Sequence, residues 1–417
     1  MRAIVLGGAL VGVVGAAAVA ALLHFYGGGT DRDRAGLDVV RTAGALVAGT
    51  GGAIALLLAA RRQRSTELTL EHQWLTLEHQ REVAATVAQD AVEQRITEIY
   101  TRAVDQIGND QALVRLGGLH ALERLAQQNS AQRQTIVDVI CAYLRMPYAL
   151  PDDEPLGEDA SAKTHLRYER QRQELQVRLT AQRILAAHLR TDAVHTFWPD
   201  IDLDLTKAQL HQFDLTHCHI RKAQFSGAQF TEYAGFAQAR FAVNAAFEGA
   251  RFTGYAAFEG ARFTGNAGFA EAQFTGYADF KGARFAGKAE FSGARLAGGG
   301  AGFSGARFAR EAEFSTARFA VHTDFEGARF TGDAEFSGAH FSGYAEFSRA
   351  QFSGDTIFAR YEVSGGEAVF DMDVGFDGAR ARPMVEGRVH VWPATWSTRE
   401  AREGEEDGWV YLVRVEK

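Results

Sequence analysis

The sequence predicts an α + β chain in which helices are followed by a β-solenoid. Two observations support this fold class. Apolar residues recur with helical spacing before residue 190, and from residue 205 large apolar residues recur every five or six positions. The second spacing fits neither a helix nor an ordinary two-faced strand. With 417 residues the chain is long enough for two or three domains, and its net charge of -8 is mild.

Residues 1–64 contain two uncharged runs, at 3–25 and 42–60, joined by a short polar loop. Each run is close to the roughly 20 residues with which a helix spans a bilayer. The alternative is a secretory signal peptide, but the first run exceeds the roughly 7–15 residues of a signal core. These features predict a transmembrane helical hairpin that contacts membrane lipid.

Arginines after the second run suggest an orientation for this hairpin. Arg61, Arg62 and Arg64 follow the run directly, and Arg2 precedes the first run. Such clusters stay on the cytoplasmic side. The two cysteines, Cys141 and Cys218, are too few for a disulfide framework and fit a reducing compartment. The predicted localisation is therefore the cell membrane, with two spans and a cytoplasmic C-terminal domain.

Residues 65–200 are predicted to be helical. No proline or glycine occurs between residues 65 and 107, which indicates one helix. Leucines at helical spacing near Leu119 and apolar residues near Ile140 indicate an antiparallel helix pair, which resembles a HEAT or armadillo unit. After a proline-rich acidic linker, residues 165–190 form a further helix.

The five-or-six spacing is clearest in "FEGARFTGYAAFEGARFTG", where phenylalanines stand five, six and five residues apart. Almost every phenylalanine has an alanine two positions earlier, which puts both on one side of an extended segment. Glycines usually follow two residues later and make corners. Short sides joined by corners make coils that stack about 4.8 Å apart. A coil then holds 22 residues, and about six coils are expected after Ile220. The predicted core includes Phe247, Phe252, Phe258, Phe263, Phe280 and Phe291.

These repeats resemble the pentapeptide-repeat family. "AQLHQ" at residues 208–212 is close to that family's A(D/N)LXX pattern, and "FxGARFxGxA" looks like its phenylalanine-centred variant. The resemblance implies a right-handed quadrilateral β-helix over residues 201–382. The N-terminal hairpin also resembles the front end of membrane-attached members. A coil of 22 residues departs from the family's usual coil of four five-residue sides.

Residues 383–417 are predicted to form a β-hairpin cap. "GRVHVWPATW" and "DGWVYLVRV" read as two alternating strands. A solenoid end exposes unpaired backbone groups and therefore needs a cover. The candidate cap residues are Trp392, Trp396 and Trp409.

No nucleophile–base set or phosphate loop is present, so the sequence does not predict an enzyme, and no cofactor is expected. One alternative is a metal site formed by residues of "HQFDLTHCHI", namely His211, His217, Cys218 and His219. Cys218 occupies the inward small-residue position, which disfavours it. A calcium loop at Asp371, Asp373 and Asp377 is a second alternative, but acids also alternate on ordinary strands.

The charged side chains of the repeats indicate which kinds of partner the solenoid can bind. Residues 201–382 hold about 18 basic and 22 acidic side chains. One column of arginines is predicted at Arg240, Arg262, Arg284, Arg307 and Arg329, and another on the opposite side at Arg251, Arg295 and Arg318. Nucleic-acid and small-molecule partners are not expected.

The predicted function is a membrane-anchored, non-catalytic scaffold that presents a rigid rod in the cytoplasm to an unknown protein partner. The alternative is a topoisomerase-binding DNA mimic, a role that some pentapeptide-repeat proteins have. Such mimicry needs a strongly acidic rod, and the arginine columns disfavour it.

Overall fold

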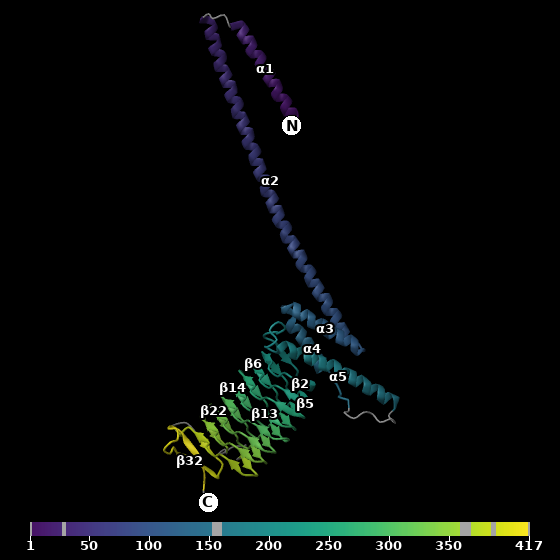
Figure 1. The fold of residues 1–417 in the computed structure, drawn as a ribbon, viewed down its shortest axis with the longest axis vertical. Helices are drawn as coiled ribbons and strands as arrows, with labels where there is room; N and C mark the ends of the chain where they lie inside the picture. Colours follow the sequence, from purple (N-terminus) through teal and green to yellow (C-terminus); the bar gives the residue numbers. More distant parts are fainter. Residues whose placement is uncertain (1, 27–30, 152–160, 359–367, 385–388, 416–417) are drawn as a thin grey trace. The chain divides into compact units, whose positions relative to one another are not determined.

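The computed structural model describes residues 2–26, 31–151, 161–358, 368–384 and 389–415. The chain divides into two compact units, Met1–Gln94 and Arg95–Lys417. Figure 1 shows the long helices of the first unit and, in the second, a stack of short strands with helices at one end.

The first unit consists of helices. α1 spans Arg2–Tyr26, and α2 spans Asp31–Ile107, so that its last residues belong to the second unit. The uncharged run at residues 42–60 is not an element of its own, since α2 continues past residue 64 without a break. The helix predicted over residues 65–107 is the C-terminal part of α2.

The predicted membrane hairpin needs correction. Among the residues that the structure describes, no helix combines the length and the apolar character that crossing a membrane requires. Alanine and glycine supply much of both uncharged runs, and their small side chains bury little apolar area. The second run also continues into the polar remainder of α2. The prediction of a two-span membrane protein with a cytoplasmic C-terminal domain is therefore wrong.

Three further helices begin the second unit. They are α3 (Ala112–Gln128), α4 (Arg133–Arg145), which follows the short 3₁₀ helix Ser130–Gln132, and α5 (Ala162–Leu189). Ser161 caps α5, since its hydroxyl accepts a hydrogen bond from the Thr164 backbone N–H. Buried leucines and isoleucines of α3, α4 and α5 share one core with the strands.

The strands form four parallel columns, one on each side of a four-sided coil. We name these columns the first to fourth faces, in chain order. The first face contains β1 (Asp202–Asp204), β4 (Lys222–Gln224), β7 (Ala245–Ala246), β11 (Ala267–Gly268), β15 (Ala289–Glu290), β19 (Ala312–Glu313), β23 (Ala334–Glu335), β27 (Thr356–Ile357) and β31 (His390–Val391). The fourth face contains β3 (His219–Ile220), β6 (Arg240–Phe241), β10 (Arg262–Phe263), β14 (Arg284–Phe285), β18 (Arg307–Phe308), β22 (Arg329–Phe330), β26 (Gln351–Phe352) and β30 (Arg380–Ala381).

The second and third faces are joined at the start of the stack, because β2 (Gln209–Asp214) and β5 (Gln229–Gly235) run along both. The second face continues with β8 (Arg251–Phe252), β12 (Gln273–Phe274), β16 (Arg295–Leu296), β20 (Arg318–Phe319), β24 (His340–Phe341) and β28 (Val369–Phe370). The third face continues with β9 (Tyr255–Ala257), β13 (Ala278–Asp279), β17 (Ala301–Gly302), β21 (Thr323–Asp324), β25 (Ala345–Glu346) and β29 (Val374–Gly375).

Stacked phenylalanine rings fill the interior. Phe247 lies over Phe269 with 4.8 Å between ring centroids, and Phe258 lies over Phe280 at the same distance. Rings within one coil meet edge to face, as Phe247 and Phe258 do at 5.5 Å. Phe247, Phe252, Phe258, Phe263, Phe280 and Phe291 are all buried.

Coil length varies while the register holds. Paired positions 202 and 222, 240 and 262, and 284 and 307 show coils of 20, 22 and 23 residues. The coil of 23 residues absorbs its extra residue at Gly299 and Gly300, whose φ angles of 64° and 101° favour glycine. The solenoid makes about 7 turns. The six predicted coils lie after Ile220, and the coil between the paired positions 202 and 222 precedes them.

Corner glycines serve two different purposes. Gly249 and Gly282 adopt φ angles of 63° and 65°, which explains the glycine at these corners. Gly254 also follows its phenylalanine by two residues, but a Cβ there would lie 1.6 Å from the backbone oxygen of Glu232 in the preceding coil. Glycine at that corner is required by the close approach of successive coils.

We expect the two kinds of glycine to differ in their tolerance of alanine. Gly282→Ala meets no neighbouring atom within 4 Å and should cost about 1–2 kcal/mol through its backbone angle alone. In Gly276→Ala the new Cβ lies 2.2 Å from the Gly254 oxygen, so the coils must separate and the cost should be at least twice as large. Denaturant unfolding of both variants measures this, and equal losses would contradict it.

At its N-terminal end the solenoid is covered by α4 and α5. The Gln134 amide of α4 exchanges two hydrogen bonds with the backbone of Asp202, at 2.9 and 3.0 Å, as a neighbouring strand would. Gln182 of α5 donates to the backbone oxygen of His211. Side-chain amides therefore satisfy backbone groups at the first strands.

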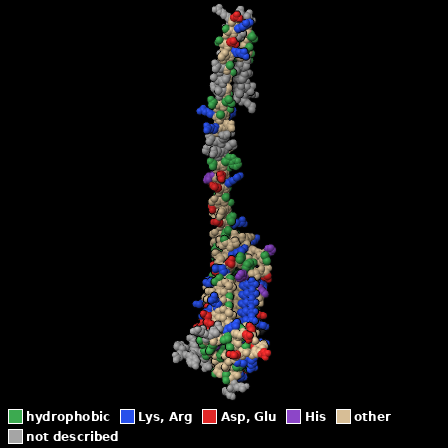
Figure 2. Space-filling view, turned by 90° about the vertical axis from the view of Figure 1, so that its left-hand side faces the viewer, with side chains coloured by type: hydrophobic (Ala, Val, Ile, Leu, Met, Phe, Trp, Pro, Cys, Tyr) green, Lys and Arg blue, Asp and Glu red, His purple; other side chains and the backbone are tan. Residues whose placement is uncertain are grey.

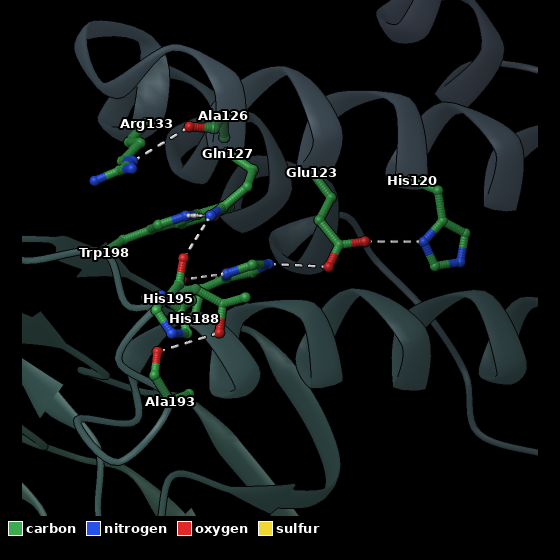
Figure 3. A network of polar contacts seen from close by, with 10 residues as sticks. His120, Glu123, Ala126, Gln127, Arg133, His188, Ala193, His195 and Trp198 are labelled. Atoms are coloured by element: carbon green, nitrogen blue, oxygen red, sulfur yellow. Dashed lines mark hydrogen bonds and ion pairs between the residues drawn. The ribbon is translucent and has the colours of Figure 1, made fainter.

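A polar network joins α3, α5 and the loop that enters the first coil (Figure 3). The buried ring of His188 stacks on Trp198 at 3.9 Å between centroids. Its Nδ1 donates to the Thr196 carbonyl at 2.6 Å, and its Nε2 lies 2.9 Å from the Glu123 carboxylate. Because both neighbours are hydrogen-bond acceptors, a proton is held between Nε2 and the carboxylate.

The electrostatics of this network predict a loss of stability in acid. Burial opposes the charge on Glu123, but hydrogen bonds from His120 and His188 outweigh it and lower the pKa of Glu123 below its usual 4.5. A lowered folded-state pKa stabilises the fold above the unfolded pKa, and the contribution disappears as the pH falls below about 4.5. Glu123→Gln should therefore lower the melting temperature near neutral pH and reduce its decline in acid, as thermal unfolding at several pH values would show. An unchanged pH profile would contradict this.

The C-terminal end is closed by antiparallel pairing. β33 (Val410–Arg414) pairs antiparallel with β30 and with β32 (Trp396–Glu400). The stretch predicted as the first cap strand is divided between β32 and β31, and β31 pairs parallel with β27. Trp392 and Trp396 lie 6.0 and 5.3 Å from Phe376, between ring centroids. Trp409 lies against the guanidinium groups of Arg380 and Arg382.

If these tryptophans cap the stack, Trp396→Ala should expose the last phenylalanines. We expect a loss of about 3–5 kcal/mol, typical of a buried tryptophan, and light scattering that rises with concentration. Trp74→Ala is the control, because that side chain is 67% exposed. Equal behaviour of the two variants would show that Trp396 is no cap.

Candidate functional site

The fourth face carries an unbroken column of arginines. The first residue of each of its strands points outward and the second, a phenylalanine in the central strands, points inward. Successive arginines are direct partners in the parallel ladder; they are Arg240, Arg262, Arg284, Arg307 and Arg329. Figure 2 shows a continuous column of basic side chains on the solenoid.

Among the residues that the structure describes, these five arginines have no acidic partners of their own. All five are exposed, and none forms an ion pair with another residue of the described part of the chain. Neighbouring strands lie about 4.8 Å apart, and two charges at that distance repel by about 1 kcal/mol in water. A bound anionic group would relieve this repulsion, so the column is suited to binding a partner with regularly spaced negative charges.

The second predicted column lies on the opposite side of the coil, on the second face. Arg251, Arg295 and Arg318 are exposed there, with Gln273 standing between the first two in the ladder. His340 follows Arg318 and pairs with Asp371 at 2.8 Å. This column is therefore shorter and interrupted.

Acidic side chains occupy the first face, a feature that the sequence reasoning missed. Glu290, Glu313 and Glu335 are partners in the ladder on three consecutive coils and are half-buried. Lys288, at the corner between the fourth and first faces, forms an ion pair with Glu313 at 2.6 Å. The 22-residue spacing that revealed the arginines would also have revealed these glutamates.

The third face combines tyrosines with carboxylates. Tyr255 donates a hydrogen bond to Asp279 at 3.0 Å, and Tyr344 donates to Glu346 at 2.7 Å. The bond to Glu346 is the main reason why the pKa of Tyr344 rises to about 12. Gly302 interrupts the acidic series. The carboxylates Asp279 and Glu346 therefore already have hydrogen-bond donors within the chain.

The histidine cluster does not form a metal centre in the described residues. The Cys218 side chain points inward, and burial raises the pKa of its thiol to about 12. His211 contacts the Thr231 hydroxyl at 3.0 Å, His219 stacks on Phe197, and His217 occupies an exposed corner with a φ of 60°. Within the described residues, no group of three or more His, Cys, Asp or Glu side chains could hold a metal ion.

The acids named as an alternative calcium loop do not gather around a common point in the described residues. Asp371 pairs with His340, and Asp373 accepts a hydrogen bond from Arg414 at 2.6 Å. Asp377 lies at the corner after Phe376, where its backbone oxygen accepts a hydrogen bond from the Arg349 N–H at 2.9 Å. The carboxylates of Asp371 and Asp373 therefore link the last coils to their neighbours.

Cavities in the described parts of the chain are poorly suited to a small substrate. One hollow of about 520 Å³ lies open along α5 beside Lys163, Arg167 and Arg170. Another of about 210 Å³ lies between α5 and β2, lined by residues such as Gln182 and Gln212. Neither gathers a nucleophile with a base.

Comparison with known proteins identifies the repeats. Residues 201–232 match the family described as Pentapeptide repeats (8 copies), and residues 225–273, 269–318 and 322–360 match Pentapeptide repeats (9 copies). No curated protein and no solved structure matches the chain. The matches indicate no catalytic family.

Proposed function

We propose that this pentapeptide-repeat chain is a non-catalytic interaction scaffold that docks an acidic protein surface on the arginine column of its fourth face. The observation that carries the proposal is the set of five exposed guanidinium groups, one per coil, in unbroken register. Their regular spacing is a property of the backbone ladder and exists before any partner binds. Such preorganisation lowers the entropic cost of association.

The fold beneath the column supports this role. Each arginine lies between a buried alanine and a buried phenylalanine, as Arg284 does between Ala283 and Phe285. Backbone hydrogen bonds tie each strand to the coil before it, as from Arg284 N–H to the Ala261 oxygen at 2.8 Å. The platform is therefore stiff, and only the arginine side chains need to adjust.

Charge on the neighbouring faces favours a narrow protein surface over nucleic acid. The arginines form a single file, with carboxylates on the first and third faces at either side. A wide polyanion laid on the fourth face would approach these carboxylates, and the net charge of -8 repels it at longer range. The same arginines disfavour the alternative of a topoisomerase-binding DNA mimic, for which no other observation speaks.

A binding experiment with a simple acidic probe tests the proposal. Fluorescently labelled poly-glutamate is titrated with the full chain and with the triple variant Arg284→Gln, Arg307→Gln, Arg329→Gln. We expect at least a tenfold weaker affinity for the variant and weaker binding at higher salt.

The control is Arg251→Gln, Arg295→Gln, Arg318→Gln, which removes the same charge from the second face. It should bind the probe nearly as well as the unaltered chain. Equal losses in the two triple variants would mean that net charge alone attracts the probe, and the proposal would then fail.

A further inference from the structure

We infer that the partner of the arginine column is a second copy of this chain, which presents the glutamate column of its first face. This inference rests on the proposed docking role of the fourth face and names its occupant. The contact would place Arg284, Arg307 and Arg329 of one copy opposite Glu290, Glu313 and Glu335 of the next.

The two columns have matching length and position. Each of these glutamates follows its arginine by six residues and lies on the adjoining side of the solenoid. Both sets occupy three consecutive coils, and both are in register along parallel ladders. A copy rotated by a quarter turn about the solenoid axis and shifted sideways by one solenoid width therefore offers three carboxylates at the heights of three guanidinium groups.

Equal spacing is the reason to prefer a second copy over an unrelated acidic segment. The rise of both columns is the strand spacing of a parallel sheet, about 4.8 Å, so every pair can meet in the same geometry. An extended acidic strand presents side chains on one face only about every 6.8 Å. Such a strand would be out of register after the second or third arginine.

Other acidic positions of the solenoid fit less well. The carboxylates of the third face are interrupted at Gly302, and two of them accept hydrogen bonds from tyrosines. On the first face, Lys288 contacts one carboxylate oxygen of Glu313, and Glu335 accepts a hydrogen bond from the Ser337 backbone N–H at 3.1 Å. Each of these carboxylates can still accept from an arginine of the second copy, because a carboxylate has about four acceptor positions.

The position of the two columns sets the symmetry of the assembly. The contact joins unlike faces, so it is heterologous, and each copy keeps one column for a further neighbour. The fourth and first faces are adjacent sides of a four-sided coil, about a quarter turn apart. Four copies with parallel axes would then close a ring in which every column is used.

The test uses full-length chains with reversed charges. One variant carries Arg284→Glu, Arg307→Glu and Arg329→Glu, and the other carries Glu290→Arg, Glu313→Arg and Glu335→Arg. Particle mass is followed by sedimentation velocity at low and high salt. We expect the unaltered chain to form assemblies up to tetramers that dissociate in salt, each variant alone to lose them, and an equimolar mixture of the two to regain them.

The matched control reverses Arg251, Arg295 and Arg318 of the second face to glutamate, which changes the net charge as much as the first variant does. It should assemble like the unaltered chain, and circular dichroism verifies that all variants are folded. A monomeric unaltered chain, an assembly that persists in both variants, or a mixture that fails to regain it would overturn the inference.

The outcome also separates this inference from the proposed docking role. If self-association fails while poly-glutamate binding still depends on the fourth-face arginines, the scaffold stands and its partner is a different acidic protein. If the arginine column binds neither poly-glutamate nor a second copy, both proposals fail.

Discussion

The distance between successive coils is the constraint on which the solenoid depends. Parallel strands require a spacing of about 4.8 Å for their hydrogen bonds. The stacked phenylalanines, such as Phe230 over Phe252 and Phe263 over Phe285, have centroid distances of 4.6 and 4.9 Å. Backbone and core therefore favour the same spacing. Glycines at Gly254 and Gly276 let the corners approach equally closely, so corners, sides and interior agree on one geometry.

The same spacing governs the outer surface. Because coils of 20, 22 and 23 residues all keep their register, a residue type repeated at one position becomes a straight column. An exposed arginine alone has little effect on binding, since surface ion pairs are weak. A column of five at fixed intervals acts together, and its geometry is maintained by the buried phenylalanines behind it.

The sequence predicted what depends on local period and missed what depends on distant contacts. The alternation of Ala283, Arg284 and Phe285 was enough to predict which side chains face the core and which face the solvent. The polar network between α3, α5 and the loop that enters the first coil could not be predicted, because Glu123 is far from His188 and Trp198 in the sequence and the three meet only in the fold. The uncharged run at residues 42–60 was wrongly predicted to be a separate membrane span, because a lack of charge within a stretch of sequence does not show where a helix ends.

The two halves of each coil have similar sequences, and this explains why faces of unlike charge are neighbours at the corners. Within a coil of 22 residues the pattern nearly repeats after 11, so Arg251 and Arg262 occupy opposite faces, as do Asp279 and Glu290. Like charges therefore lie across the solenoid from each other, and unlike charges lie on adjacent faces. This arrangement separates the two arginine columns by the full width of the core, which limits their mutual repulsion. It also gives the rod neighbouring sides that are complementary, a property that uniformly acidic or basic solenoids lack.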